Sequence, residues 1–438
     1  MDTPSPAISS GRAWYAVLLL GTLYIVAFVD RAILGLLVEP IKADLGVTDN
    51  QMSLLIGATF AVFYSLVGLP LGRLADRISR RQIIIATALV WGSCTFASGF
   101  ATTFLFLCLM RIGVAVGEAA LTPSVTSLIS DMFPRERRAR AMGIYVAMGN
   151  MGAKLAYVIG GLVLAAIGTR LVLDLPVLGA VKPWQAVFMT VAAPALLIAL
   201  LIFFTLPEPA RPMAAQAAPV GKKPIAALQS RWRPLVLLFV GGALGQTIVL
   251  GMSAWAPSYL LREFGWQISE AGIYIGAAAT AGGVSGVLIF SNLVEWLVRR
   301  GHLNALPMTL VCGLLSGSAL MVAAGLAATP MLFLVLFALG LFALSGTGVM
   351  CMVAVQWTAP TTLRGELMST YLLINSLLSM GLGPSAITLI SGLFGGPAHL
   401  AAGFIAVAAV CGPLGAAVVL STRAKLVALH REAIADGA

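Results

Sequence analysis

Long apolar runs separated by short polar connections make up most of this chain. A helix needs about 20 apolar residues to cross the hydrocarbon of a bilayer. Twelve runs approach or exceed that length, so the pattern predicts an all-α polytopic membrane protein with twelve transmembrane helices. The predicted helices cover residues 13–38, 51–72, 82–101, 104–130, 138–166, 184–206, 234–259, 270–298, 306–328, 331–356, 363–390 and 399–421.

The basic residues between these runs predict the orientation. Lys and Arg concentrate in the cytoplasmic loops of membrane proteins. An even number of helices places both termini on one side. If that side is the cytoplasm, most of the 27 Lys and Arg residues are cytoplasmic. We therefore expect a multi-pass protein of the inner cell membrane with both termini cytoplasmic. In this orientation, the four basic residues predicted on the opposite, external side of the membrane are Lys42, Arg170, Lys182 and Arg262.

Repeated motifs indicate that the chain consists of two related halves. The loop GRLADRISRR at residues 72–81 is echoed by SNLVEWLVRR at 291–300, each with a carboxylate four residues before an Arg-Arg pair. A second echo, residues 134–142 against 360–368, precedes the fifth helix of each half. The longest polar connection separates the halves. We expect pseudo-symmetric six-helix bundles at 1–206 and 234–438, the second with a short cytoplasmic tail, joined by a cytoplasmic linker at 207–233.

Composition excludes several other classes of protein. Apolar residues make up 59% and charged residues 10% of the chain, whereas soluble domains carry about 25% charged residues. The net charge of +10 arises from loops and not from a basic domain interleaved with aromatics, so no nucleic-acid partner is expected. All five cysteines lie in apolar segments and no HExxH or GxSxG motif occurs. We therefore expect no enzyme activity, no metal and no cofactor.

The loop Gly72-Arg-Leu-Ala-Asp76-Arg77, ending in Arg80-Arg81, resembles the connection between helices 2 and 3 in the major facilitator superfamily of transporters. Arg111-Ile-Gly113 resembles the Arg-x-Gly motif of that family's fourth helix. The resemblance implies the major facilitator fold and alternating access. Glycines in the predicted fifth helix resemble a motif associated with antiporters, but Ala156-Tyr157 stands where the family has Gly-Pro, which leaves antiport open. These glycines are Gly143, Gly152, Gly160 and Gly161.

Two further motifs resemble one group within this superfamily. Val29-Asp30-Arg31 in the first helix, and Arg111 with Gly117-Glu118-Ala119 in the fourth, are similar to spinster-like transporters. Animal members of that group move lysophospholipids and sphingosine phosphate. Organic-anion symporters share some of these residues, so both groups remain in consideration.

Charged residues inside the predicted helices are candidates for the functional site. A charge in the bilayer interior costs several kcal/mol unless it faces the bundle interior and finds a partner. Counting from the outer helix ends at about 1.5 Å per residue places Asp30 and Arg111 at matching depth, with Glu118 and Lys154 deeper. We therefore predict two layers of ion pairs, Asp30 with Arg111 and Glu118 with Lys154. Arg31 diverges from Asp30 by about 100° around its helix.

These charges suggest proton coupling. The three histidines fall in loops or the tail, so any proton carrier within the membrane must be a carboxylate, either Asp30 or Glu118. The cations Arg31, Arg111 and Lys154 are then candidates for binding an anionic substrate. The alternative is that the pairs only fix helix packing.

The second half has no charged residue in the middle of a predicted helix. A cationic half and an apolar half together suit an amphiphile with an anionic head, and we assign Trp255 and Phe337 to substrate binding. We expect a monomeric, proton-coupled secondary transporter of a lysolipid-like or sphingolipid-like anion, with protons and membrane lipids as partners. The alternatives are a symporter of small organic anions such as sugar acids, a drug or metabolite exporter, and a channel or sensor.

The loop motif predicts a cytoplasmic gate. Asp76 can approach the N-terminus of the eleventh helix near Arg364, where backbone N–H groups and the helix dipole attract a carboxylate. Arg73, Arg77 and Arg81 can pair with Asp131 or Glu136, and Gly72 allows close helix approach. The alternative is that these arginines only determine topology. The predicted gating residues are Gly72, Asp76, Arg77, Arg81, Asp131, Glu136 and Arg364.

Overall fold

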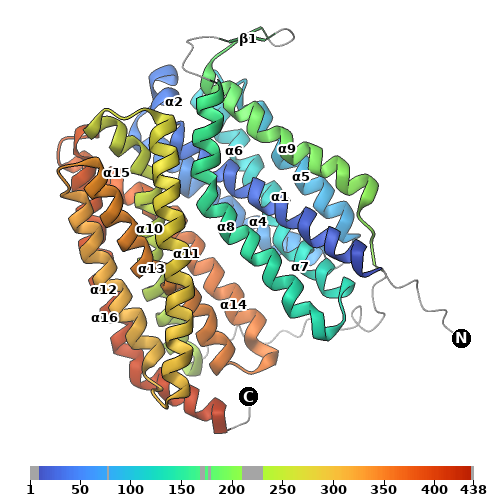
Figure 1. The fold of residues 1–438 in the computed structure, drawn as a ribbon, viewed down its shortest axis with the longest axis vertical. Helices are drawn as coiled ribbons and strands as arrows, with labels where there is room; N and C mark the ends of the chain where they lie inside the picture. Colours follow the sequence, from blue (N-terminus) through green and yellow to red (C-terminus); the bar gives the residue numbers. More distant parts are fainter. Residues whose placement is uncertain (1–8, 76–77, 168–172, 176–178, 210–229, 436–438) are drawn as a thin grey trace, which may run out of the picture. The chain divides into compact units, whose positions relative to one another are not determined.

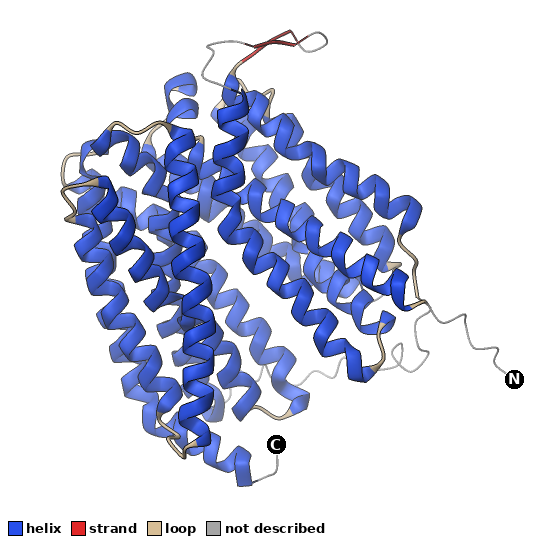
Figure 2. Ribbon diagram, in the orientation of Figure 1, coloured by secondary structure: helices blue, strands red, loops and turns tan. Residues whose placement is uncertain are grey.

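The computed structural model describes residues 9–75, 78–167, 173–175, 179–209 and 230–435. Helices make up almost all of this part of the chain (Figure 2). The one sheet in it is a short antiparallel hairpin of β1 (Leu173–Leu175) and β2 (Gly179–Val181), in which Leu173 pairs with Val181. The sequence prediction of an all-α membrane protein is confirmed, with this hairpin as an unpredicted addition.

The chain divides into two compact units that do not coincide with two continuous halves. Unit 1 consists of Met1–Val47 and Thr59–Gly221, and unit 2 of Thr48–Ala58 and Lys222–Ala438. The helices of unit 1 are α1 (Ser10–Leu36), α2 (Val38–Leu45), α4 (Thr59–Ala75), α5 (Arg80–Ser98), α6 (Phe104–Ala119), α7 (Leu121–Met132), α8 (Arg135–Ile167) and α9 (Pro183–Thr205) (Figure 1).

Unit 2 contains the remaining helices and two π-helical segments. The π-helices are η1 and η5, and η4 and η6 are short 3-10 turns. The elements of unit 2 are α3 (Asp49–Ser53), η1 (Leu54–Ala58), η4 (Ser230–Trp232), α10 (Arg233–Phe264), α11 (Ile268–Arg299), α12 (Ala305–Gly325), α13 (Pro330–Thr358), α14 (Thr361–Asn375), η5 (Ser376–Leu382), α15 (Gly383–Leu393), η6 (Pro397–His399) and α16 (Leu400–Ala435).

Eleven helical stretches among the described residues are long and apolar enough to cross a membrane. The predicted segment 82–101 corresponds to α5, which is helical but is not among these eleven. It begins with the polar sequence Arg80-Arg81-Gln82, which lowers its apolar content. At the other end of the chain, α16 continues as helix to Ala435, beyond the predicted end at residue 421. The protein is therefore a multi-pass membrane protein.

Glycines allow α1 and α8 to lie side by side in unit 1 (Figure 1). A Cβ atom at Gly152 would lie 2.7 Å from Cα of Ile25, and one at Gly160 would lie 2.6 Å from Cδ1 of Leu36. A larger residue at either position would push the helices apart, because heavy atoms do not approach this closely. Two of the four glycines noted in the sequence therefore hold α8 against the helix that carries Asp30.

Equivalent threonines begin one helix in each unit. The side chains of Thr103 and Thr329 accept hydrogen bonds from the backbone N–H groups of Phe106 and Leu332, each at 3.3 Å. Both residues have extended backbone angles at the helix N-cap, where a hydroxyl satisfies a free backbone donor. Thr103 fixes the start of α6, which carries Arg111 and Glu118.

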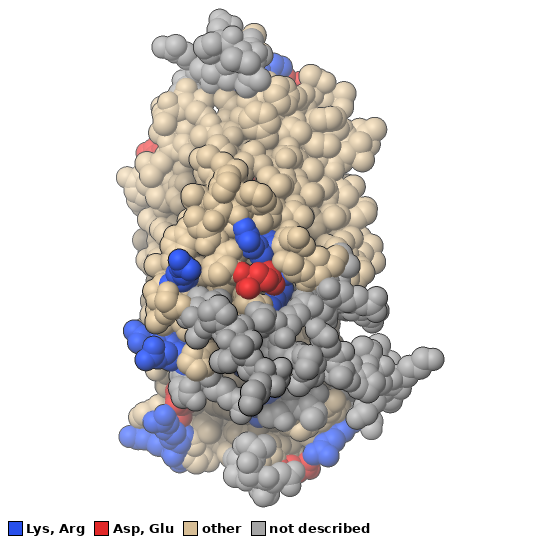
Figure 3. Space-filling model, turned by 90° about the vertical axis from the view of Figure 1, so that its right-hand side faces the viewer, with Lys and Arg blue, Asp and Glu red and all other residues tan. Residues whose placement is uncertain are grey.

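The surface agrees with a lipid environment. On the face drawn in Figure 3, Lys, Arg, Asp and Glu gather toward the lower end, and uncharged residues cover most of the area above them. Large apolar side chains are widely exposed; Phe204, for example, is 72% exposed. Such a surface is unfavourable in water and favourable against lipid tails.

Candidate functional site

Four charged side chains meet inside unit 1, and we call Asp30, Arg31, Arg111 and Glu118 the four-charge cluster. Nη1 of Arg111 lies 3.5 Å from Oδ2 of Asp30. Nε of Arg31 donates a hydrogen bond of 2.6 Å to Oε2 of Glu118, with a second contact from its Nη2. Asp30 and Glu118 are each 1% exposed. The predicted pairing of Asp30 with Arg111 is confirmed.

Helix geometry explains why four residues on two helices form two pairs. Arg111 and Glu118 are seven residues apart on α6, about two turns, and therefore lie on one face. Asp30 and Arg31 are neighbours on α1 and diverge by about 100°. Asp30 faces Arg111 and also accepts a 2.9 Å hydrogen bond from Thr95 of α5, whereas Arg31 reaches Glu118.

The predicted pairing of Glu118 with Lys154 is wrong, because Arg31 is the ion-pair partner of Glu118. Lys154 on α8 is half-buried and has no ion-pair or hydrogen-bond partner within the described ranges. Gly152 faces α1, and Lys154 lies two residues further, about 200° around the helix. It therefore points away from α1. Matching depth did not reveal this difference in direction.

Aromatic rings surround the guanidinium of Arg31. Its central carbon lies 5.2 Å from the ring centre of Phe28, 4.8 Å from Phe60 and 5.3 Å from Tyr64. The same Phe60 ring lies 5.0 Å from the guanidinium carbon of Arg111. Cations over aromatic faces are stabilised, most strongly where water is excluded. No sequence motif marks Phe60, because its spacing of four residues from Tyr64 is equally typical of ordinary helix packing.

The cluster retains unused hydrogen-bonding capacity. Within the described part of the chain, Nε and Nη2 of Arg111, Oδ2 of Asp30 and Oε1 of Glu118 are buried without hydrogen-bond partners. Unsatisfied buried polar atoms cost about 1–3 kcal/mol each. The arrangement therefore favours binding an anionic group at Arg111 and a proton at either carboxylate.

The two predicted substrate-binding residues of unit 2 are packed inside it. Trp255 and Phe337 are each 0% exposed. The indole N–H of Trp255 donates a 3.0 Å hydrogen bond to Ser53, and Phe337 stacks on Phe333 at 5.6 Å. Neither presents a free face here, and their role in substrate binding stays a prediction.

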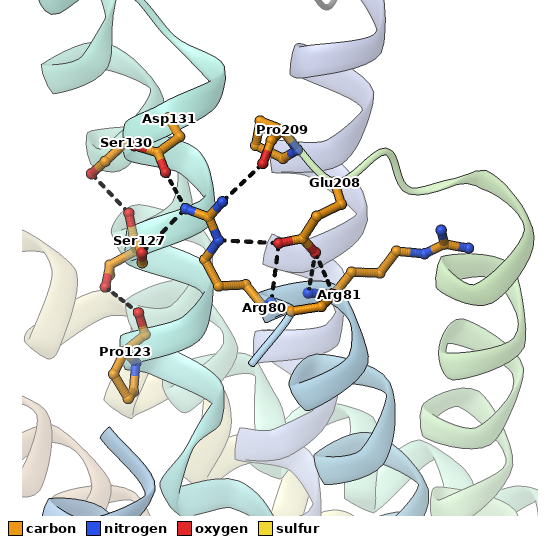
Figure 4. Close-up of polar contacts among 10 residues, drawn as sticks. Arg80, Arg81, Pro123, Ser127, Ser130, Asp131, Glu208 and Pro209 are labelled. Carbon is orange, nitrogen blue, oxygen red and sulfur yellow. Dashed lines mark hydrogen bonds and ion pairs between the residues drawn. The ribbon is translucent and has the colours of Figure 1, made fainter. Parts of the chain in front are cut away.

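A second polar cluster lies at the start of α5 (Figure 4). The guanidinium of Arg80 forms an ion pair with Asp131 of α7 and donates to Oε1 of Glu208 at 3.2 Å and to the carbonyl oxygen of Pro209 at 3.0 Å. Arg80, and not Arg81, pairs with Asp131; the guanidinium of Arg81 donates to the carbonyl oxygen of Phe203. The alternative partner predicted for Arg81, Glu136, has a side chain outside the described residues. The contact of Arg80 with Glu208 was not predicted, because the two residues are 128 positions apart in the sequence.

The other predicted gating residues remain untested. Asp76, Arg77 and the side chain of Glu136 lie outside the described residues, and the burial of Gly72 is not described either. Nε of Arg364 donates a 2.9 Å hydrogen bond to the carbonyl oxygen of Ala359.

Glu208 caps the N-terminus of α5. It accepts hydrogen bonds from the backbone N–H groups of Arg80 at 3.1 Å and Arg81 at 2.7 Å, and from the hydroxyl of Ser79 at 2.8 Å. Burial raises the pKa of this carboxyl group, but these hydrogen bonds outweigh burial and hold the pKa below its ordinary value. Ionised Glu208 therefore stabilises the folded state above its unfolded pKa, and this contribution is lost as pH falls through the lower folded pKa.

We expect Glu208→Gln to lower the stability of the detergent-solubilised protein at neutral pH by about 0.5–2 kcal/mol, the range for loss of a helix cap. The difference from the wild type should shrink as pH falls through the folded pKa, because the wild-type carboxylate is then also neutral. Melting temperatures measured across acidic and neutral pH check this. The control is Glu295→Gln, which removes an exposed pair with Arg299 and should have little effect. An equal loss at every pH would contradict the role of ionised Glu208.

Two helical units in a membrane, with ion pairs buried between helices of one unit, define a polytopic carrier architecture. The chain belongs to the Major Facilitator Superfamily, which matches residues 20–384. It is therefore a transporter and not an enzyme, as predicted.

Individual relatives show the range of proteins to which the chain is similar. It is 27% identical to an MFS-type efflux pump of Mycolicibacterium smegmatis, over 68% of each chain. It is also 27% identical to a D-galactonate transporter of Escherichia coli, over 78% of this chain and 81% of that one. Among solved structures, it resembles a bacterial homologue of the human lysosomal transporter Spinster in an inward-facing, unoccupied conformation. Identity is 26%, the TM-score is 0.79, and the match covers 98% of this chain and 99% of the other.

Proposed function

We propose that this transporter couples the movement of an organic anion to that of protons through the four-charge cluster. The observation that carries the proposal is the buried pairing of Asp30 with Arg111, in which the Nε and Nη2 atoms of Arg111 have no hydrogen-bond partners in the described part of the chain. Ionisable groups within membrane helices are costly and are typically found on ion and substrate pathways.

Competition for Arg111 gives the coupling a physical basis. A planar guanidinium binds carboxylate or phosphate through two parallel hydrogen bonds. An anion bound in this way draws Arg111 from Asp30, which lies 3.5 Å away. A carboxylate that loses its cation in a medium of low dielectric constant takes up a proton more readily. Substrate binding therefore favours protonation of Asp30, and loss of that proton favours substrate release.

We infer that the substrate carries an apolar portion beside its anionic group. The buried polar residues of unit 2 in the described ranges are Ser, Thr and His430, without Asp, Glu, Lys or Arg. Such an interior tolerates an acyl chain better than a polyhydroxylated sugar. The sequence resemblance to spinster-like transporters, whose animal members move lysophospholipids, supports this choice. Similarity to the D-galactonate transporter supports the alternative of a small sugar acid. Both share an anionic group that Arg111 could bind.

The two substrate classes differ in their expected response to chain length. In proteoliposomes, we expect n-alkyl phosphates to compete for counterflow more strongly as the chain lengthens, by up to about fourfold per methylene, equivalent to about 0.8 kcal/mol. D-galactonate should compete weakly. Arg111→Lys should lose affinity for every alkyl phosphate, because an ammonium cannot bind two oxygens in parallel. Arg423→Lys on the exposed side of α16 is the control with retained charge.

Affinity that is independent of chain length, together with stronger binding of D-galactonate, would establish the sugar-acid alternative. Unchanged affinity in Arg111→Lys would exclude Arg111 as the anion-binding residue. Outward transport of uncharged drugs that no anion inhibits would establish the alternative of a drug or metabolite exporter.

We infer that the protein works as a monomer in the inner membrane with both termini in the cytoplasm. The distribution of Lys and Arg supports this orientation. Labelling of single cysteines introduced at Ser9 and at Arg300 by a membrane-impermeant reagent tests it, since both should react only from the cytoplasmic side.

A further inference from the structure

One short segment of the chain belongs to a different unit from both of its neighbours. Thr48–Ala58, which we call the docked segment, is part of unit 2, whereas the chain before Thr48 and after Ala58 is part of unit 1. It consists of the capped turn α3 and the π-helix η1. Short π-helices in membrane and soluble proteins are often found at functional positions.

Buried hydrogen bonds and one ion pair hold the docked segment to the rest of unit 2. The hydroxyl of Ser53 donates to the carbonyl oxygen of Pro384 at 3.0 Å and accepts from Trp255 at 3.0 Å and Thr388 at 2.9 Å. Asp49 accepts two hydrogen bonds from Arg262, at 2.7 and 2.8 Å. The segment is therefore held at both ends of α3 by specific polar contacts.

The π-helix η1 is also closely packed. It lies against the second π-helix, η5, and a Cβ atom at Gly57 would lie 2.5 Å from the carbonyl oxygen of Met380. Glycine at position 57 therefore permits direct contact between the two backbones.

Phe60 follows the docked segment by two residues and lies in unit 1. Its ring is 0% exposed and lies 4.8 Å from the guanidinium carbon of Arg31 and 5.0 Å from that of Arg111. Among the described residues, it is the aromatic ring that contacts a member of each ion pair in the four-charge cluster. An apolar ring against both guanidinium groups disfavours exchange of their carboxylate partners.

We infer that Phe60 is a positioning residue through which docking of Thr48–Ala58 controls the pairing of the four-charge cluster. This inference rests on the proposed function of that cluster. The backbone is helical without interruption from Asp49 through η1 to Ala75, so displacement of Ala58 also displaces Phe60. Alternating access requires movement of one unit against the other. The docked segment is bound to unit 2 and continuous in sequence with unit 1, so it must then leave its partners in unit 2. The ring of Phe60 withdraws from Arg31 and Arg111 as a result.

Withdrawal of the ring has a defined chemical consequence. With Phe60 in place, Arg111 is held near Asp30 and Arg31 near Glu118. Without it, each guanidinium loses a cation–π contact and becomes free to turn toward the other carboxylate or an anionic substrate. Partner exchange is thereby restricted to one stage of the transport cycle, which prevents proton movement without substrate.

The first test separates coupling from binding. In proteoliposomes with n-alkyl phosphate as the probe, we expect Phe60→Leu to reduce accumulation driven by a pH gradient about tenfold, the effect of losing a desolvated cation–π contact. Counterflow of the same probe, which needs no proton movement, should persist. The control Phe188→Leu removes a ring of similar burial, 3% exposed, on α9, and should retain both activities. Full accumulation in Phe60→Leu would overturn the inference.

The second test observes the ring directly and needs no substrate. Ser53→Cys with Thr388→Cys, in a background without native cysteines, places two thiols where hydroxyls now lie 2.9 Å apart. Oxidation should lock the docked segment. With 4-fluorophenylalanine at position 60, we expect one fluorine NMR signal in the oxidised protein and a shifted or additional signal after reduction.

Identical spectra in both redox states would show that the ring does not follow the docked segment, and the inference would fail. If the spectra differ but the wild type accumulates no probe in a pH gradient, proton coupling fails and the link between the docked segment and Phe60 stands.

Discussion

Replacement of Asp30 by Asn is expected to abolish accumulation of the anionic probe in a pH gradient while counterflow of the probe continues. Asn has the shape of Asp and can still accept the hydrogen bond from Thr95, so the local packing is retained. It cannot take up a proton. Arg111 would also lose its carboxylate partner and remain available to the substrate. Parallel measurement of accumulation and counterflow in proteoliposomes distinguishes loss of coupling from loss of binding.

Glu263→Gln provides the matched control for this experiment. Glu263 is an exposed carboxylate near the end of α10, and its neutralisation should leave both activities unchanged. If Asp30→Asn accumulates the probe as the wild type does, Asp30 is not the proton carrier. Glu118 would then be the remaining carboxylate of the cluster.

Neutralising Glu118 is expected to lower the stability of the folded protein strongly. Glu118→Gln leaves Arg31 without its carboxylate in a largely dehydrated position. Removal of one partner from a buried ion pair costs about 3–5 kcal/mol, because the other charge remains uncompensated. We expect low yield and a much lower melting temperature in detergent.

The double variant Arg31→Gln with Glu118→Gln tests whether the uncompensated charge is the cause. Neutral amides can hydrogen-bond to each other, so the double variant should recover most of the stability lost in Glu118→Gln. Its transport should remain impaired, because one cation and one carboxylate of the cluster are absent. A double variant less stable than Glu118→Gln would show that Arg31 is held mainly by the rings of Phe28, Phe60 and Tyr64.

The sequence predicted those features of the site that depend on position along a helix. The apolar runs gave the membrane helices, and depth within them paired Asp30 with Arg111. Depth says nothing about direction around a helix, and Lys154 was therefore wrongly placed beside Glu118. The Arg80–Glu208 contact joins residues 128 apart through a loop, and no local pattern marks it.

The docked segment was also beyond sequence analysis. The run 51–72 predicted one regular helix, whereas the structure has α3, the π-helix η1 and α4 in succession. The π-helical turn packs against η5, over 300 residues away in sequence, and Gly57 gives the only local sign of close approach. Phe60 acquires its importance from this arrangement and not from any motif.

The length of α16 has a practical consequence for imaging. Its 36 residues extend about 54 Å at about 1.5 Å per residue, well beyond the roughly 30 Å of hydrocarbon. The far end stays attached to unit 2: Arg423 donates to Asn304 at 2.9 Å, His430 stacks on Trp357, and Glu432 pairs with Arg231. A folded marker domain fused in helical register after Ala433 would therefore be held rigidly outside the detergent micelle. It would supply the alignment feature that a transporter of 45.5 kDa otherwise lacks in electron cryomicroscopy.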